Sequence, residues 1–167
     1  MRQASRRGAG IFVDAIIARA VARRVHSGQV DRRGDPLIEH VERVAQAVPS
    51  DARALAYLHD ILERGDPSSE ELRELELTDE EWDVLVLLTR RQRQSYKLHV
   101  LRIARAPGKA GTIARAIKLA DLDDHLRHRQ HRAQAPNYTW ARRQVLASQQ
   151  ARGEVGRDEA QRKVAVT

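Results

Sequence analysis

The sequence predicts an all-α fold, a compact helical bundle of about eight helices. Apolar residues recur at helical spacing through most of the 167 residues, and no stretch shows the β-branched alternation of a strand. The hydrophobic content is 41% and the aromatic content only 4%, so Leu, Ile, Val and Ala must form the core. A chain of this length is expected to form one domain with a sizeable core.

The predicted helices follow one another with short connections, as in a bundle. We expect helices over about residues 11–27, 36–48, 51–65, from 68, from 78, over 95–107, 111–130 and 139–151. The first helix ends at His26, and Pro36 suits the first turn of the second. Residues 49–51 can cap the third helix, which carries His59 and Asp60.

The later boundaries rest on capping and helix-breaking residues. Ser68 begins a short acidic helix, and Thr78 with Glu81 has the spacing of a capping box. Ser95 begins a further helix, and residues 136–137 are expected to break the long helix before the last one. Residues 1–10 are predicted to be a disordered basic lead-in, residues 11–151 to form the domain, and residues 152–167 to be a disordered polar tail.

The net charge of +7 is concentrated near the C-terminus. From Arg127 onward there are nine Lys or Arg and three Asp or Glu, so the body before it is close to neutral. A solvated basic tail is the simpler interpretation, and nucleic-acid binding through this segment is the alternative. The absence of cysteine, of an apolar leader and of any apolar run near the ~20 residues of a membrane span leads us to expect a cytoplasmic protein without membrane contact.

Four polar residues interrupt otherwise apolar helices: His26, the pair His59 and Asp60, and Asp121. Burial of an imidazole or a carboxylate costs several kcal/mol unless the group has a partner. Imidazole nitrogen with carboxylate oxygen suits a divalent ion such as Mn²⁺, Fe²⁺ or Zn²⁺, bound at the helix edge between His59 and Asp60. Buried hydrogen bonds among the four residues, without metal, are the alternative.

Several stretches around these residues resemble one known family. They are His26-Ser-Gly-Gln-Val-Asp-Arg32, Gly34-x-Pro-x-Ile-x-His40, Leu58-His-Asp-Ile-Leu-Glu63, Leu88-Thr-Arg-Arg91, Ser95-Tyr96 and Lys118-Leu-Ala-Asp-Leu122. Their order and content are similar to those of the HD-domain metal phosphohydrolases, and in particular to short, stand-alone members of the RelA/SpoT-type alarmone hydrolases. The resemblance extends over residues 15 to 126, about two thirds of the chain.

The resemblance implies an HD-domain fold and a Mn²⁺-dependent phosphohydrolase. Enzymes of that branch remove the 3′-pyrophosphate from guanosine tetraphosphate, the alarmone of the stringent response, with an ion held by two His and two Asp. By this resemblance, the expected metal ligands are His26, His59, Asp60 and Asp121. Glu63 matches the family's glutamate that orients the attacking water. The substrate is therefore expected to be a phosphorylated nucleotide.

The chain departs from the family pattern around the expected pocket. Arg64 stands where the family has Asp, and such a cation would either repel the ion or bind a substrate phosphate. His125 replaces an Asn four residues after Asp121, where it would act as general acid, contact the substrate or add a ligand. Leu37 replaces an aromatic residue. These changes leave open a second function, an impaired HD domain that binds a nucleotide or a protein partner as a regulator.

Four further residues are expected to bind the substrate: Arg32, Tyr96, Lys118 and Asp124. His40 is expected to be a structural, hydrogen-bonded histidine in the second helix. The histidines at 125, 128 and 131 diverge around their helix, which argues against a separate metal site.

Overall fold

The computed structural model describes residues 13–31, 34–128 and 134–154, and within these ranges it confirms an all-α fold without strands. The eight helices are α1 (Ala15–Val25), α2 (Leu37–Ala47), α3 (Arg53–Tyr57), α4 (Ser69–Glu74), α5 (Asp79–Leu88), α6 (Tyr96–Arg105), α7 (Gly108–Arg127) and α8 (Ala135–Ala151). The predicted lead-in 1–10, Arg32, His131 and most of the predicted tail, from residue 155, lie outside the described residues.

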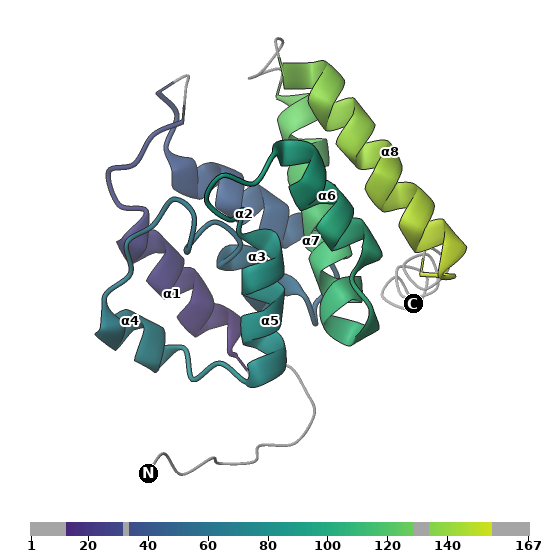
Figure 1. The fold of residues 1–167 in the computed structure, drawn as a ribbon. Coiled ribbons are helices and arrows are strands. Elements are labelled where there is room, and N and C mark those ends of the chain that lie inside the picture. Colours follow the sequence, from purple (N-terminus) through teal and green to yellow (C-terminus); the bar gives the residue numbers. More distant parts are fainter. Residues whose placement is uncertain (1–12, 32–33, 129–133, 155–167) are drawn as a thin grey trace, which may run out of the picture.

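Helix α7 joins the two parts of the bundle. It packs against α2 and α5 on one side and against α6 and α8 on the other (Figure 1). The larger core cluster draws its residues from α1, α2, α3, α5 and α7, from Ile103 of α6 and from connecting segments. A smaller cluster joins α6, α7 and α8 around Val100, Leu122 and Val145. Helix α7 thus contributes to both cores, and its buried polar residues are Arg115, Asp121 and Asp124.

Side-chain caps form at the predicted starts of α4, α5 and α6, whereas the predicted cap from residues 49–51 is wrong: α3 begins after Ala52, which has no side chain that could cap it. Thr78 and Glu81 form the expected capping box, and a second box joins Ser68 and Glu71. The Ser95 hydroxyl accepts a hydrogen bond from the Leu98 N–H at the start of α6. Such caps stabilise a helix by about 1 kcal/mol each, because they pair N–H groups that have no partner within the helix.

Two predicted boundaries near α7 and α8 are wrong for local reasons. Helix α8 begins at Ala135 rather than after residues 136–137, because Pro136 lies in its first turn, where the missing N–H is not needed. Helix α7 begins at Gly108 and includes Gly111. A Cβ at Gly111 would lie 2.2 Å from Ala106 O, so glycine permits the close approach of α7 to the end of α6.

Among the described residues, no helix has both the length and the apolar character needed to cross a membrane.

Candidate metal centre

The segment that carries His59 and Asp60 is not helical, contrary to the prediction. Helix α3 ends at Tyr57, and turns continue to Arg64. The Ala56 carbonyl, which would serve the helix, is instead 2.7 Å from His59 Nδ1. The backbone then closes shorter turns, with Ile61 N–H donating to Leu58 O at 3.0 Å. This geometry makes Nδ1 the protonated nitrogen of His59 and leaves its Nε2 as an acceptor.

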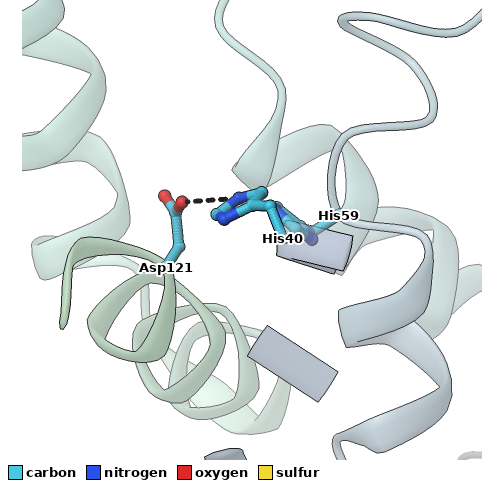
Figure 2. A group of neighbouring side chains, drawn as sticks. All are labelled: His40, His59 and Asp121. Atoms are coloured by element: carbon cyan, nitrogen blue, oxygen red, sulfur yellow. Dashed lines mark ion pairs between the residues drawn. The ribbon is translucent and has the colours of Figure 1, made fainter. Parts of the chain in front are cut away.

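Three buried side chains from different parts of the chain meet between α2, α7 and the turns after α3. They are His40, His59 and Asp121, each of which offers a ligand atom within 4.8 Å of the others (Figure 2). Their exposed fractions are only 5%, 6% and 5%. Figure 2 shows the Asp121 carboxylate pointing from its helix toward the two imidazole rings. The structure therefore contains a buried group that could hold a metal ion.

Asp121 is ionised and is surrounded by positive or protonatable groups. Lys118 Nζ lies 2.7 Å from Oδ2, while His125 Nε2 and His40 Nε2 lie 3.0 and 3.3 Å from Oδ1. Burial alone would raise the pKa of Asp121, but Lys118 and His125 lower it well below its usual value. Burial would likewise lower the pKa of Lys118, but Asp121 raises it overall. The cluster is thus negative at Asp121 and closely balanced by neighbouring cations.

The two histidines of the cluster have opposite protonation preferences. Burial lowers the pKa of His59, so this ring is neutral, as a metal ligand must be. Burial would also lower the pKa of His40, but hydrogen bonds to Asp121 and Asp124 raise it to about 9. A bound cation would therefore replace a proton on His40.

Asp60 is adjacent to the cluster and carries a second negative charge. Its Oδ1 lies 3.6 Å from His59 Nε2, and its Oδ2 is paired with Arg64 Nε at 3.1 Å. Burial alone would raise the pKa of Asp60, but His59 and Arg64 lower it overall. Asp60 is thus an ionised carboxylate at the edge of the three-residue cluster, and Arg64 compensates its charge.

The donor set suits a divalent cation. His59 Nε2 is buried and has no hydrogen-bond partner among the described residues, which is costly unless another ligand pairs with it. The second imidazole, on His40, and the ionised carboxylate of Asp121 complete a nitrogen and oxygen set that suits Mn²⁺, Fe²⁺ or Zn²⁺. The structure therefore supports a possible metal site and leaves the identity of the metal open.

His26 does not belong to the group of three. It is buried at the end of α1, where its Nδ1 lies 3.0 Å from Gln29 Oε1. Its Nε2 is also buried without a hydrogen-bond partner in the described part of the chain. The group of three instead contains His40, which the sequence-based interpretation treated as structural, and the role of His26 as a ligand stays a prediction.

Glu63 and Arg64 lie at the surface beyond Asp60. Glu63 Oε2 accepts a hydrogen bond of 3.0 Å from the Arg90 backbone N–H, and its side chain is otherwise exposed. This bond holds the loop that carries three exposed cations, Arg90, Arg91 and Arg93. Glu63 therefore links the predicted catalytic segment to a basic loop that the sequence-based interpretation did not assign.

Two further predicted site residues, His125 and Tyr96, lie along one column of rings. His125 stacks between His40 and Tyr138, with ring centroids 4.7 and 5.0 Å away, and Tyr138 meets Tyr96 edge to face. The Tyr96 hydroxyl is buried without a hydrogen-bond partner among described residues. Burial raises the pKa of Tyr96 to about 12, so its hydroxyl remains a donor. The column connects the cluster to α8.

Asp124 is buried and points toward His40 rather than toward solvent. Its carboxylate bonds His40 Nδ1 and the guanidinium of Arg43. The sequence-based interpretation missed Arg43 and treated His40 as purely structural. An available signal was that His40, Val41 and Val44 share one face of α2, which puts the imidazole toward the core.

No protein-family model matches this chain, and a search of curated proteins finds no significant match.

Proposed function

We propose that the protein is a metal-dependent phosphohydrolase that acts on a phosphorylated nucleotide, with Mn²⁺ as the expected ion. The single observation that carries this proposal is the buried cluster of His40, His59 and Asp121, in which the neutral His59 Nε2 has no hydrogen-bond partner among the described residues. An enclosed two-histidine and carboxylate set beside a further Asp and an exposed Glu is typical of sites that activate water. The similarity to HD-domain motifs supports the same reaction class.

The residues divide into ligands and groups that handle the proton and the phosphate. His40, His59 and Asp121 would hold the ion, and Asp60 is the nearest further carboxylate. A divalent ion there would supply a Lewis acid that lowers the pKa of water and stabilises developing negative charge on phosphate. The role of His26 as a ligand, which the resemblance implies, is a separate prediction that the comparison of His26→Ala with His40→Ala tests.

Glu63 is the proposed general base. It follows Asp60 by one turn, and only one of its two oxygens is engaged by Arg90 N–H. An exposed carboxylate held in this way can orient water and accept its proton. A general base typically contributes about 10²- to 10⁴-fold to the rate.

Cations around Glu63 are the proposed phosphate contacts. Arg64 has a side chain 48% exposed, and Arg90 and Arg91 are exposed on the loop that Glu63 holds. Guanidinium groups bind phosphate oxygens in bidentate fashion and oppose charge that develops in the transition state. Lys118 donates a hydrogen bond to Asp121, so its charge would balance that carboxylate before it contacts a phosphate. Contacts from Arg32, Tyr96 and His125 to the substrate stay predictions.

A second function, nucleotide binding without turnover, is favoured by the ion pair between Arg64 and Asp60. This pair occupies the carboxylate nearest to the cluster. If it persists in solution, the centre would bind a phosphorylated ligand through its cations while water activation is impaired.

The test is turnover by purified protein stripped with chelator and reconstituted with Mn²⁺. The substrates are guanosine tetraphosphate and a panel of adenine and guanine nucleotides, with products separated by anion exchange. We expect turnover that Glu63→Gln lowers by about 10²-fold or more in kcat. The matched control is Glu70→Gln, a change at an exposed residue of α4, which should leave turnover unchanged.

The same assay separates the two functions. Binding by calorimetry without product, together with a gain of activity in Arg64→Asp, would support the non-catalytic form. Absence of both binding and product across the panel would contradict the proposed function in either form.

A further inference from the structure

Asp124 is the most heavily bonded carboxylate next to the candidate metal centre. Its Oδ2 lies 2.8 Å from His40 Nδ1, and Arg43 donates to it twice, from Nε to Oδ1 at 2.7 Å and from Nη2 to Oδ2 at 3.1 Å. His128 Nδ1 lies 3.2 Å from Oδ1. The residue is 7% exposed, so these bonds form largely out of water.

The bond to Asp124 determines which nitrogen of His40 faces the cluster. An ionised carboxylate can only accept, so Nδ1 of His40 carries the proton in this bond. The opposite nitrogen, Nε2, then points to Asp121, 3.3 Å away, and toward the position that an ion would take between the ligands. A carboxylate behind a ligating imidazole is the arrangement that orients the ring and raises its basicity as a ligand.

Arg43 in turn keeps the carboxylate ionised and in place. Burial alone would raise the pKa of Asp124, but hydrogen bonds from His40 and Arg43 lower it overall. The bidentate geometry also restricts rotation of the carboxylate, because both of its oxygens are bonded to one planar group. Since Arg43 and His40 both belong to α2, the contact joins one face of that helix to α7.

We propose that Asp124 and Arg43 are positioning residues of the metal centre, which act through His40 and do not touch the ion or the substrate. This inference rests on the proposed function in so far as it requires an ion at His40. It replaces substrate binding as the role of Asp124, because both carboxylate oxygens are already bonded inside the protein.

The competing explanation is that the contact only holds α2 against α7. The two explanations differ in what they predict for folded protein. If the bond is purely structural, its loss would change the unfolding temperature of the metal-free protein and leave the affinity of the folded protein for the ion unchanged. If the bond positions His40, its loss would weaken binding of the ion even at temperatures far below unfolding.

The experiment measures Mn²⁺ affinity by competition with a chromogenic chelator, well below the unfolding temperature of each variant. We expect Asp124→Asn to weaken Mn²⁺ binding by about 10- to 100-fold. Arg43→Gln should cause a smaller loss, and because its side chain is 32% exposed it also provides a variant that folds if Asp124→Asn does not. The matched control is Asp123→Asn, the adjacent carboxylate on α7, which bonds Arg142 and should leave the affinity unchanged.

The outcomes distinguish the positioning role from the proposed phosphohydrolase function. Wild-type affinity in Asp124→Asn and Arg43→Gln, or in Arg43→Gln alone if the Asn variant does not fold, would overturn the positioning role while leaving the proposed function intact. Weakened Mn²⁺ binding in the two variants, together with no turnover by the wild-type protein, would support positioning and count against the phosphohydrolase. Failure of the wild-type protein to bind Mn²⁺ would overturn both.

Discussion

Replacement of Asp121 by Asn is expected to remove the bound ion and the phosphohydrolase activity together. The carboxylate is 5% exposed and lies within 3.3 Å of Lys118, His125 and His40. An amide of the same shape cannot supply the negative charge that a divalent cation requires. We therefore expect activity to fall by more than about 100-fold, beyond the loss typical of residues behind the ligands.

The same change is expected to destabilise the metal-free protein. Loss of the Asp121 charge leaves the Lys118 ammonium, 14% exposed, without its closest counter-charge. Breaking such a buried pair from one side costs about 3 kcal/mol or more. Urea unfolding in the presence of chelator measures this loss, and elemental analysis of metal per chain measures the ligand role.

A double variant separates the two effects of Asp121→Asn. Adding Lys118→Met removes the uncompensated charge and should restore much of the stability, because replacing both members of a buried pair can be nearly neutral. It should not restore the ion. Wild-type metal content in Asp121→Asn would contradict its assignment as a ligand.

Replacement of Glu154 by Ala is expected to destabilise the protein by about 3 to 5 kcal/mol. Its carboxylate bonds the Arg115 guanidinium at 2.6 and 2.9 Å, and Arg115 is 1% exposed. Arg115 also donates to Ala106 O at 2.6 Å and so ties the end of α6 to the residues that follow α8. Without Glu154 a buried guanidinium is left without a counter-charge.

The measurement is urea unfolding at pH 7, with Asp123→Asn as the comparison. The pair between Asp123 and Arg142 is partly exposed, so its loss should cost less than about 1 kcal/mol. Burial would raise the pKa of Glu154, but Arg115 lowers it below its usual 4.5. Its contribution is therefore complete above that pH and is lost on further acidification. Equal losses for the two variants would show that Arg115 finds other compensation.

Much of the fold follows from local sequence signals. Apolar periodicity predicts α1, α2 and α5 to α7, and the capping box at Thr78 forms as its spacing indicates. The helix predicted through His59 fails because the imidazole itself takes the Ala56 carbonyl, a side-chain competition that periodicity does not represent. The break predicted at Pro136 is wrong because a proline in the sequence marks either the first turn of a helix or the end of one, and the sequence alone does not distinguish the two.

The candidate site was predictable only in part. Asp121 and His59 could be found because each interrupts an apolar face. His40 could not be distinguished from an ordinary core histidine, because its partner Asp124 is 84 residues away and only the packing of α2 on α7 brings them together. Single-helix patterns describe which face a residue occupies, and long-range packing decides which residues it meets.

The central claim is that an ion binds where His40, His59 and Asp121 meet. The most direct test is elemental analysis of metal per chain after Mn²⁺ reconstitution of His40→Ala and His26→Ala, alongside the wild-type protein. Both residues are buried histidines, so the two variants remove the same chemical group from the two candidate positions. We expect wild-type and His26→Ala protein to hold the ion and His40→Ala to lose it. Loss of the ion in His26→Ala with retention in His40→Ala would contradict the account.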